Sequence, residues 1–154
     1  MKQLYLEIAA AGGLTLLHGP PLRDLLLGKP PARLSLYVHR LTIEQVARIV
    51  DKLEIPIKQQ TEVSLTTGTL DIQLLPHIQD LNTQADFTVN LIYWNPLTDT
   101  YYDPFAGRSD LKRRLVRAPR KLFLDNPAKM LEACLVAAEI TGTLEVETWF
   151  SIYE

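Results

Sequence analysis

The sequence predicts an α+β domain that ends in a short helical extension. Segments with the two-residue period of a strand and segments with the helical period follow one another in mixed order along the first four fifths of the chain. The remaining residues have helical character, beginning at an Asn-Pro pair typical of a helix start. With 154 residues, the chain is long enough for one domain with a real core and a small appendage.

The composition excludes several classes of protein. A hydrophobic share of 47% and a charged share of 22% are ordinary for a globular protein, and a net charge of -2 gives no general attraction to nucleic acid or anionic membranes. The single cysteine, Cys134, excludes an internal disulfide and a zinc site built on several thiolates, and we expect it in the core. No apolar run approaches the roughly 20 residues of a membrane span. Because Glu7 interrupts the N-terminal apolar stretch, a signal peptide is disfavoured and a cytoplasmic protein is expected.

The chain is organised around residues 14–38, which read as strand, tight turn, short helix, loop and strand. The capping box of Thr42 and Gln45 opens the clearest helix. We expect helices over residues 3–11, 21–27, 42–53, 109–114 and 126–142 and from 145 to the end, and strands over residues 14–17, 34–38, 55–58, 63–65, 70–75, 87–94 and 101–102. Turn residues predict hairpins for the strand pairs 63–65 with 70–75 and 87–94 with 101–102, separated by an irregular loop over residues 76–84.

Four segments carry a resemblance to a known family: LLHGPPLRDLLLGKPPARLSL, QADFTVNLIYWNP, YYDPFAGRSDLKRRLVRAP and FLDNPAKMLEACLVAAEITG. Together they resemble, in the same order, the head domain of bacterial tRNA CCA-adding enzymes and poly(A) polymerases, which are class II nucleotidyltransferases of the polymerase β superfamily. The resemblance implies a small mixed β-sheet flanked by helices. It places the head at residues 1–122 and a truncated helical neck at 123–154, with no body or tail domain expected after Glu154.

The residues that match the family's metal site are degenerate. In the family, two carboxylates on the second strand hold Mg²⁺ for phosphoryl transfer. The matching positions carry Arg33 and Ser35, and Asp71 is the best match for a third acid on a neighbouring strand. Arginine repels a dication and serine is a weak neutral ligand, so Asp71 is expected to be a vestige and no metal is expected. Glu145 and Glu147, a similarly spaced acid pair, are expected at a solvated helix start.

The phosphate-binding turn is also altered. Gly19 matches the family's first glycine, but Pro20 and Pro21 follow it and supply no backbone N–H group to a phosphate. Arg23 and Asp24 are retained, and we expect them to form a structural ion pair. The lone His18 beside this turn is expected to be a packed or exposed bystander.

The positions that resemble the base-reading helix are half preserved. Asn126 replaces the family's acid, and Lys129 replaces an arginine and so loses its planar fork. Gln84-Ala85 replace an arginine pair, whereas Asp86 and Asn90 remain. Two interpretations stay open for Asp86, Asn90, Asn126 and Lys129: a residual nucleotide pocket, or helix caps and surface charge, of which we favour the second.

Seven of the 16 Lys and Arg residues lie between positions 108 and 121. This stretch could track a phosphate backbone, or it could be a solvated helix face, which we favour because no aromatic residue lies within it. The candidate RNA-contacting patch is Arg108, Lys112, Arg113, Arg114 and Arg117.

These observations predict a catalytically inactive nucleotidyltransferase-like protein that serves as a binding or scaffold module and needs no cofactor. Its partner would be an unidentified protein, a second copy bound through an apolar face of the neck, or, weakly, RNA or a nucleotide. The alternative is a divergent active nucleotidyltransferase for tRNA 3'-end or poly(A) addition, which would use Asp71 and Mg²⁺.

Overall fold

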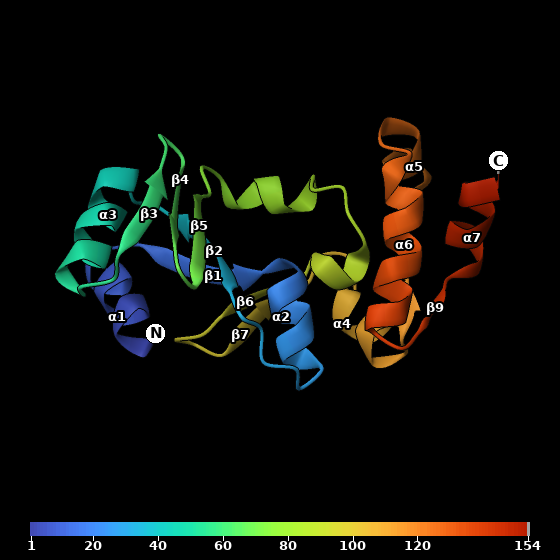
Figure 1. The fold of residues 1–154 in the computed structure, drawn as a ribbon, viewed down its shortest axis with the longest axis horizontal. Helices are drawn as coiled ribbons and strands as arrows, with labels where there is room; N and C mark the ends of the chain where they lie inside the picture. Colours follow the sequence, from blue (N-terminus) through green and yellow to red (C-terminus); the bar gives the residue numbers. More distant parts are fainter. Residues whose placement is uncertain (154) are drawn as a thin grey trace.

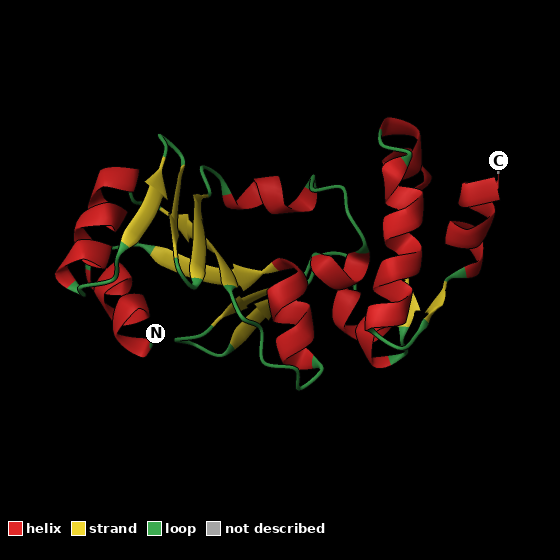
Figure 2. Cartoon of the chain, viewed as in Figure 1, coloured by secondary structure: helices red, strands yellow, loops and turns green. Residues whose placement is uncertain are grey.

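The protein, described here over residues 1–153 by a computed structural model, is built on a seven-stranded sheet that lies between two groups of helices (Figures 1 and 2). The strands are β1 (Leu14–His18), β2 (Leu34–His39), β3 (Ile57–Gln60), β4 (Ser64–Thr67), β5 (Leu70–Leu74), β6 (Tyr93–Asn95), β7 (Thr100–Tyr102), β8 (Leu115–Val116) and β9 (Thr143–Leu144). The α-helices are α1 (Lys2–Ala10), α2 (Gly19–Leu26), α3 (Ile43–Lys52), α4 (Gly107–Lys112), α5 (Arg120–Asp125), α6 (Ala128–Glu139) and α7 (Val146–Tyr153). Two 3₁₀ turns complete the chain, η1 (Ile78–Asn82) and η2 (Thr88–Asn90).

The large sheet is mixed, as predicted. Its strand order is β3-β4-β5-β2-β1-β6-β7, and in the described chain β2 and β5 form its parallel pair while the other neighbours are antiparallel. The hairpins β4-β5 and β6-β7 are both present. The short strands β8 and β9 pair in parallel and connect the chain before α5 to the chain after α6. The predicted α+β class is therefore confirmed.

The sheet has a core on each face. On one face, α1, α2 and α3 bury a large apolar cluster that includes Ile8, Leu22 and Val46 against Leu36 and Ile72 of the strands. On the other face, a smaller cluster contains Leu16, Leu75, Leu81 and Tyr93. Burying apolar area on both sides stabilises the sheet and sets its register, because a one-residue slip would exchange the two faces.

Local signals in the sequence explain the helix boundaries. The Thr42 Oγ1 atom accepts a hydrogen bond from the Gln45 N–H, and the Gln45 Oε1 atom accepts one from the Thr42 N–H at 2.8 Å, which is the predicted capping box. Helix α2 begins at Gly19, with its two prolines in the first turn where a missing N–H leaves no intrahelical bond unmade. Helix α1 is followed by Gly12 in the left-handed region, with φ of 87°.

Several predicted elements need correction. The basic helix expected over residues 109–114 ends at Lys112, since Arg114 has a left-handed φ of 58°. The strand expected over residues 87–94 is confined to β6, because η2 occupies its start. Helix α5 and the β8-β9 pair were not predicted, and the expected boundary after residue 122 falls within α5. The expected end of the last helix, Glu154, lies outside the described residues.

The prediction that Cys134 lies in the core is wrong. Helix α6 turns Ala133, Val136 and Ala137 toward the core, so Cys134 lies on the opposite face and is exposed. The sequence could not distinguish the two faces, because both are apolar. Among the described helices, none is long and apolar enough to cross a membrane.

Candidate functional site

One face of the sheet carries a row of polar and aromatic side chains across four neighbouring strands. Asp71 on β5 pairs in register with Ser35 on β2, Ser35 pairs with His18 on β1, and His18 pairs with Tyr93 on β6. Because side chains alternate along a strand, these four residues point to the face opposite the fully buried Leu36. Tyr93 is buried in the cluster on this face and His18 is packed beside it, so the accessible part of the row is its other end, at Ser35 and Asp71.

At one end of this row, Arg33 and Asp71 form a two-pronged ion pair. The Arg33 Nε atom donates to Asp71 Oδ2 at 3.1 Å, and Arg33 Nη2 donates to Asp71 Oδ1 at 2.5 Å. The same Nη2 atom donates to the backbone carbonyl of Thr67 at 3.4 Å, which fixes the plane of the guanidinium. Both side chains remain close to half exposed. A parallel pair of N–H···O bonds is the geometry in which arginine binds a carboxylate most strongly.

The residues at this position do not fit a magnesium ion. Mg²⁺ needs near-octahedral oxygen ligands and is normally held by more than one acid. Here the one carboxylate, Asp71, already accepts two hydrogen bonds from a cation, and Ser35 beside it is neutral. Across the described residues, no group of three or more His, Cys, Asp or Glu side chains is placed to hold a metal ion.

The turn before α2 is reshaped by its prolines. Gly19 has φ of 72°, in the left-handed region that glycine adopts without strain, and it directly follows the last residue of β1. Pro20 and Pro21 then occupy the first turn, so two successive backbone donors are missing at the helix N-terminus. This end of α2 consequently lacks the cradle of N–H groups that binds a phosphate.

His18 is a packed side chain, one of the two bystander roles predicted for it. Its ring stacks on Tyr37, with the ring centroids 3.8 Å apart and an interplanar angle of 7°, and Tyr93 lies at 6.3 Å. Burial without a charged partner lowers the pKa of His18 to about 4. The imidazole is therefore neutral near pH 7.

The predicted ion pair of Arg23 with Asp24 is confirmed, and it belongs to a larger network. Arg23 is only 3% exposed, and its guanidinium lies 2.9 Å from Asp24 Oδ1. It also donates to Asn90 Oδ1 at 3.3 Å and to Glu139 Oε2 at 2.7 Å. Glu139 lies on α6, so Arg23 connects the head to the neck helix. No sequence signal identified Glu139, which is 116 positions away from its partner.

A second set of contacts extends this network to the start of α6. Asp86 accepts hydrogen bonds from Asn90 Nδ2 at 3.2 Å and from Lys129 Nζ at 3.1 Å, and Lys129 also contacts Glu132 at 2.8 Å. Burial tends to lower the pKa of Lys129, but the hydrogen bonds to Glu132 and Asp86 outweigh it, and the pKa lies above its usual value. Lys129 is thus a charged residue held between two acids.

The cap interpretation is therefore correct for one residue and wrong for two others. Asp86 and Asn90 do not cap a helix; they bond to each other and to the cations of the network. Asn126 does act at a helix start, since its Oδ1 atom accepts the Ala128 N–H at 3.2 Å. The structure brings Arg23, Asp86, Asn90 and Lys129 together and leaves Asn126 outside.

A cleft of about 420 Å³ lies beside Asp86, between the head and the last helices. Charges of both signs face it, from Arg117 on one side and from Glu145 and Glu147 at the start of α7 on the other. Glu145 also accepts hydrogen bonds from the Thr148 N–H and hydroxyl, which confirms the predicted helix start.

The five residues of the candidate RNA-contacting patch do not all share one face, because Arg108, Lys112 and Arg114 line one cleft and Arg117 lines another. Arg117 pairs with the buried Asp110 at 3.0 Å, and the Arg114 Nη1 atom donates to the carbonyl of Ile140 at 2.8 Å. The guanidinium of Arg108 lies 4.0 Å from the centre of the Tyr101 ring, an aromatic contact from outside the basic stretch. Lys112 and Arg113 are exposed at the end of α4.

The mixed sheet, with its row of side chains facing away from α1 and α3, defines the head fold of a nucleotidyltransferase. The family model of the Poly A polymerase head domain matches residues 40–117, half of the chain. The protein therefore belongs to the poly(A) polymerase head domain family.

Individual relatives agree with this assignment. The chain is 36% identical over 62 residues to the Multifunctional CCA protein of Xylella fastidiosa, covering 40% of this chain and 15% of the relative. It is 24% identical over 152 residues to the CCA-adding enzyme of Geobacillus stearothermophilus, covering 84% of this chain and 37% of the relative.

Solved structures share the fold. A tRNA nucleotidyltransferase complexed with a primer tRNA and an incoming ATP analog superposes on 97% of this chain with a TM-score of 0.84 and 22% identity, covering 48% of that structure. The Bacillus stearothermophilus CCA-adding enzyme in complex with CTP also matches over 97% of this chain, with a TM-score of 0.75, 21% identity and 41% of its own length covered. The chain spans less than half the length of these relatives.

Proposed function

We propose that this chain is a catalytically inactive nucleotidyltransferase head that serves as a binding module. The observation that carries the proposal is the ion pair of Arg33 with Asp71. Arg33 stands where the sequence resemblance expects the first metal-binding carboxylate, and its guanidinium occupies both oxygens of the acid that remains.

The electrostatics of this pair act against metal binding. A dication at Asp71 would have to displace the guanidinium or remain within a few ångströms of its positive charge, and Ser35 offers no compensating negative charge. Phosphoryl transfer in this class of reaction depends on metal ions that neutralise the developing charge. The missing donors at Pro20 and Pro21 remove a second contribution to triphosphate binding.

Lys129, which replaces the arginine of the family's base-reading helix, belongs to an ion-pair network whose charges are already paired. Lys129 is held by Asp86 and Glu132, so reading a base edge would require breaking one of these contacts. The relatives are named as enzymes that act on tRNA, and one solved neighbour holds a primer tRNA. These names support RNA or a nucleotide as the ligand of the module.

Exposed apolar side chains support an additional protein partner or self-association. Leu131 and Leu135 on α6 are 75% and 63% exposed, and Phe150 on α7 is 59% exposed. Solvent-exposed apolar side chains on neighbouring helices are typical of an association surface. A monomeric mass by light scattering at high protein concentration would count against self-association.

Incubation with labelled ATP or CTP, tRNA, and Mg²⁺ or Mn²⁺ tests the proposed inactivity. We expect no incorporation above a protein-free control. Incorporation that disappears in Asp71→Ala, but persists in Asp51→Ala, would overturn the proposal and support a divergent active nucleotidyltransferase. Asp51 is a matched control because it is an exposed acid on α3, away from the row of side chains on the sheet.

A further inference from the structure

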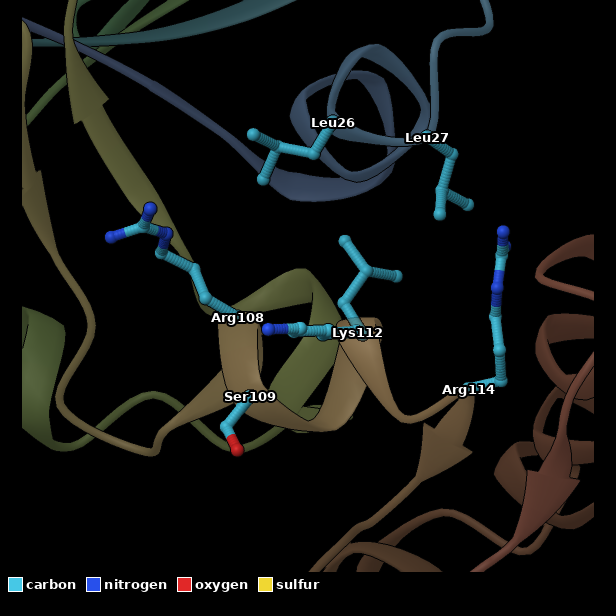
Figure 3. Close-up of a pocket in the computed structure, with 7 residues that line it drawn as sticks. Leu26, Leu27, Arg108, Ser109, Lys112 and Arg114 are labelled. Carbon is cyan, nitrogen blue, oxygen red and sulfur yellow. The ribbon is translucent and has the colours of Figure 1, made fainter.

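A cleft of about 650 Å³ lies between the end of α2 and helix α4, and none of its lining residues belongs to the row of side chains on the sheet (Figure 3). Leu26 and Leu27 line it from α2, and Arg108, Lys112 and Arg114 contribute cations from α4 and the residues after it. In Figure 3 the side chains of Arg108 and Arg114 rise on two sides of the space below the leucines. The volume is within the range of ligand sites in proteins.

All of the charged side chains that line this cleft are positive, although the whole chain carries a net charge of -2. The arrangement of side chains around α4 explains why only positive charges face the cleft. Asp110, the acid of α4, is 1% exposed and turned to the other side of the helix, where it accepts hydrogen bonds from Thr88 and Arg117. Arg108 and Lys112 are four residues apart, on one helix face and about 6 Å apart along the axis. The acid is thus neutralised internally, and the face toward the cleft keeps only cations.

The three cations are held to different degrees. Arg108 lies over the Tyr101 ring, and Arg114 donates to the carbonyl of Ile140, so both guanidinium groups are oriented while keeping further N–H donors. Lys112 is exposed and makes no ion pair with the described residues. Oriented cations lose less side-chain entropy when they bind an anion.

The geometry points to a binding site for a single strand of nucleic acid, which we propose lies along this cleft with its phosphodiester groups on Arg108, Lys112 and Arg114. The apolar surface of Leu26 and Leu27 would contact a sugar or base of the same strand. This proposal rests on the binding role proposed above, and it assigns the role to α4 instead of the sheet face. The shared chemistry is the phosphodiester backbone, which RNA and DNA both provide.

Fluorescence anisotropy with a labelled single-stranded RNA, and with a DNA of the same sequence, tests the site on the full chain. We expect binding whose logarithmic salt dependence has a slope of about -2 for three phosphate contacts. Lys112→Ala should weaken binding by about two- to fivefold, and Lys112→Ala with Arg108→Gln by about tenfold, with a shallower salt slope. Tighter binding of RNA than of DNA would identify contacts to the 2′-hydroxyl.

Arg113→Ala is the matched control, because Arg113 is an exposed cation next to Lys112 that does not line the cleft. Unchanged binding in Arg113→Ala, with loss in Lys112→Ala, supports the site. Equal loss of binding in the two variants would show that the strand does not bind in the cleft, while the proposed role of the protein as a binding module would stand. If the wild type binds no nucleic acid, both the proposed cleft site and the nucleic-acid part of the proposed function are wrong. The proposed catalytic inactivity is tested separately by the incorporation assay. Circular dichroism of each variant confirms that the fold is unchanged.

Discussion

Replacing Arg23 by alanine should destabilise the protein substantially, because this residue connects three parts of the chain. Its guanidinium is 3% exposed and contacts Asp24 beside it, Asn90 in η2 and Glu139 at the end of α6. Truncation leaves the Oδ1 atom of the buried Asn90 without a donor, and two carboxylates without their cation.

The magnitude follows from the burial of each partner. A buried amide oxygen without a donor costs about 1–3 kcal/mol, and breaking a fully buried ion pair costs about 3–5 kcal/mol. The Asp24 and Glu139 side chains are 33% and 57% exposed, so water compensates part of the loss. We therefore expect the free energy of unfolding to fall by about 3 kcal/mol, and the midpoint of thermal unfolding to fall by roughly 6–12 °C.

Urea unfolding followed by the fluorescence of Trp94 and Trp149 measures this change. Glu139→Gln is the control, since it removes only the more exposed charge and should cost about 1 kcal/mol or less. A loss below 1 kcal/mol for Arg23→Ala, or equal losses for both variants, would refute the assignment of Arg23 as a buried connection between head and neck.

Three further predictions follow from single residues. The pKa of His18 is about 4 in the folded protein and 6.5 in the unfolded chain, so the unfolded state binds more protons between these pH values. The free energy of unfolding should therefore fall by up to about 3 kcal/mol as the pH drops from 6.5 to 4. Urea unfolding at several pH values should show a smaller pH dependence for His18→Gln. Ala106 has φ of 58°, so Ala106→Gly should raise the free energy of unfolding by about 1 kcal/mol by relieving a left-handed conformation, and a lower unfolding midpoint would count against this. Thr42→Ala removes the capping box of α3 and should lower the free energy of unfolding by about 1 kcal/mol in the same assay. An unchanged free energy of unfolding would show that the cap does not stabilise α3.

Local patterns in the sequence predicted most of the secondary structure. The capping box at Thr42, the glycine after α1 and the prolines of α2 each act within a few residues of the boundary that they define, so they could be read directly. The strands β8 and β9 could not, because two residues of a strand have no visible period and depend on a partner 28 positions away.

The sequence predicted which residues lie at the candidate site, but not all of the contacts that these residues make. The resemblance identified Arg33, Ser35 and Asp71, and the structure brings Arg33 and Asp71 into contact across 38 positions. Glu139 was missed, because an ion pair between distant segments leaves no local pattern. Glu132 lies three residues after Lys129 on α6, so the helical spacing could have predicted this pair. For the basic stretch the sequence left a phosphate-binding surface and a solvated helix face as alternatives. In the structure Arg108, Lys112 and Arg114 line a cleft, whereas Arg117 pairs with Asp110.

The interaction of divalent cations with the sheet face tests the central claim most directly. Titration calorimetry with Mg²⁺ or Mn²⁺ and ATP should show no metal-dependent binding to the wild type, because Arg33 occupies Asp71. Arg33→Asp with Ser35→Asp restores two acids beside Asp71 and should bind the dication, provided that circular dichroism shows an unchanged fold. Micromolar, metal-dependent binding to the wild type that is lost in Asp71→Ala would contradict the account.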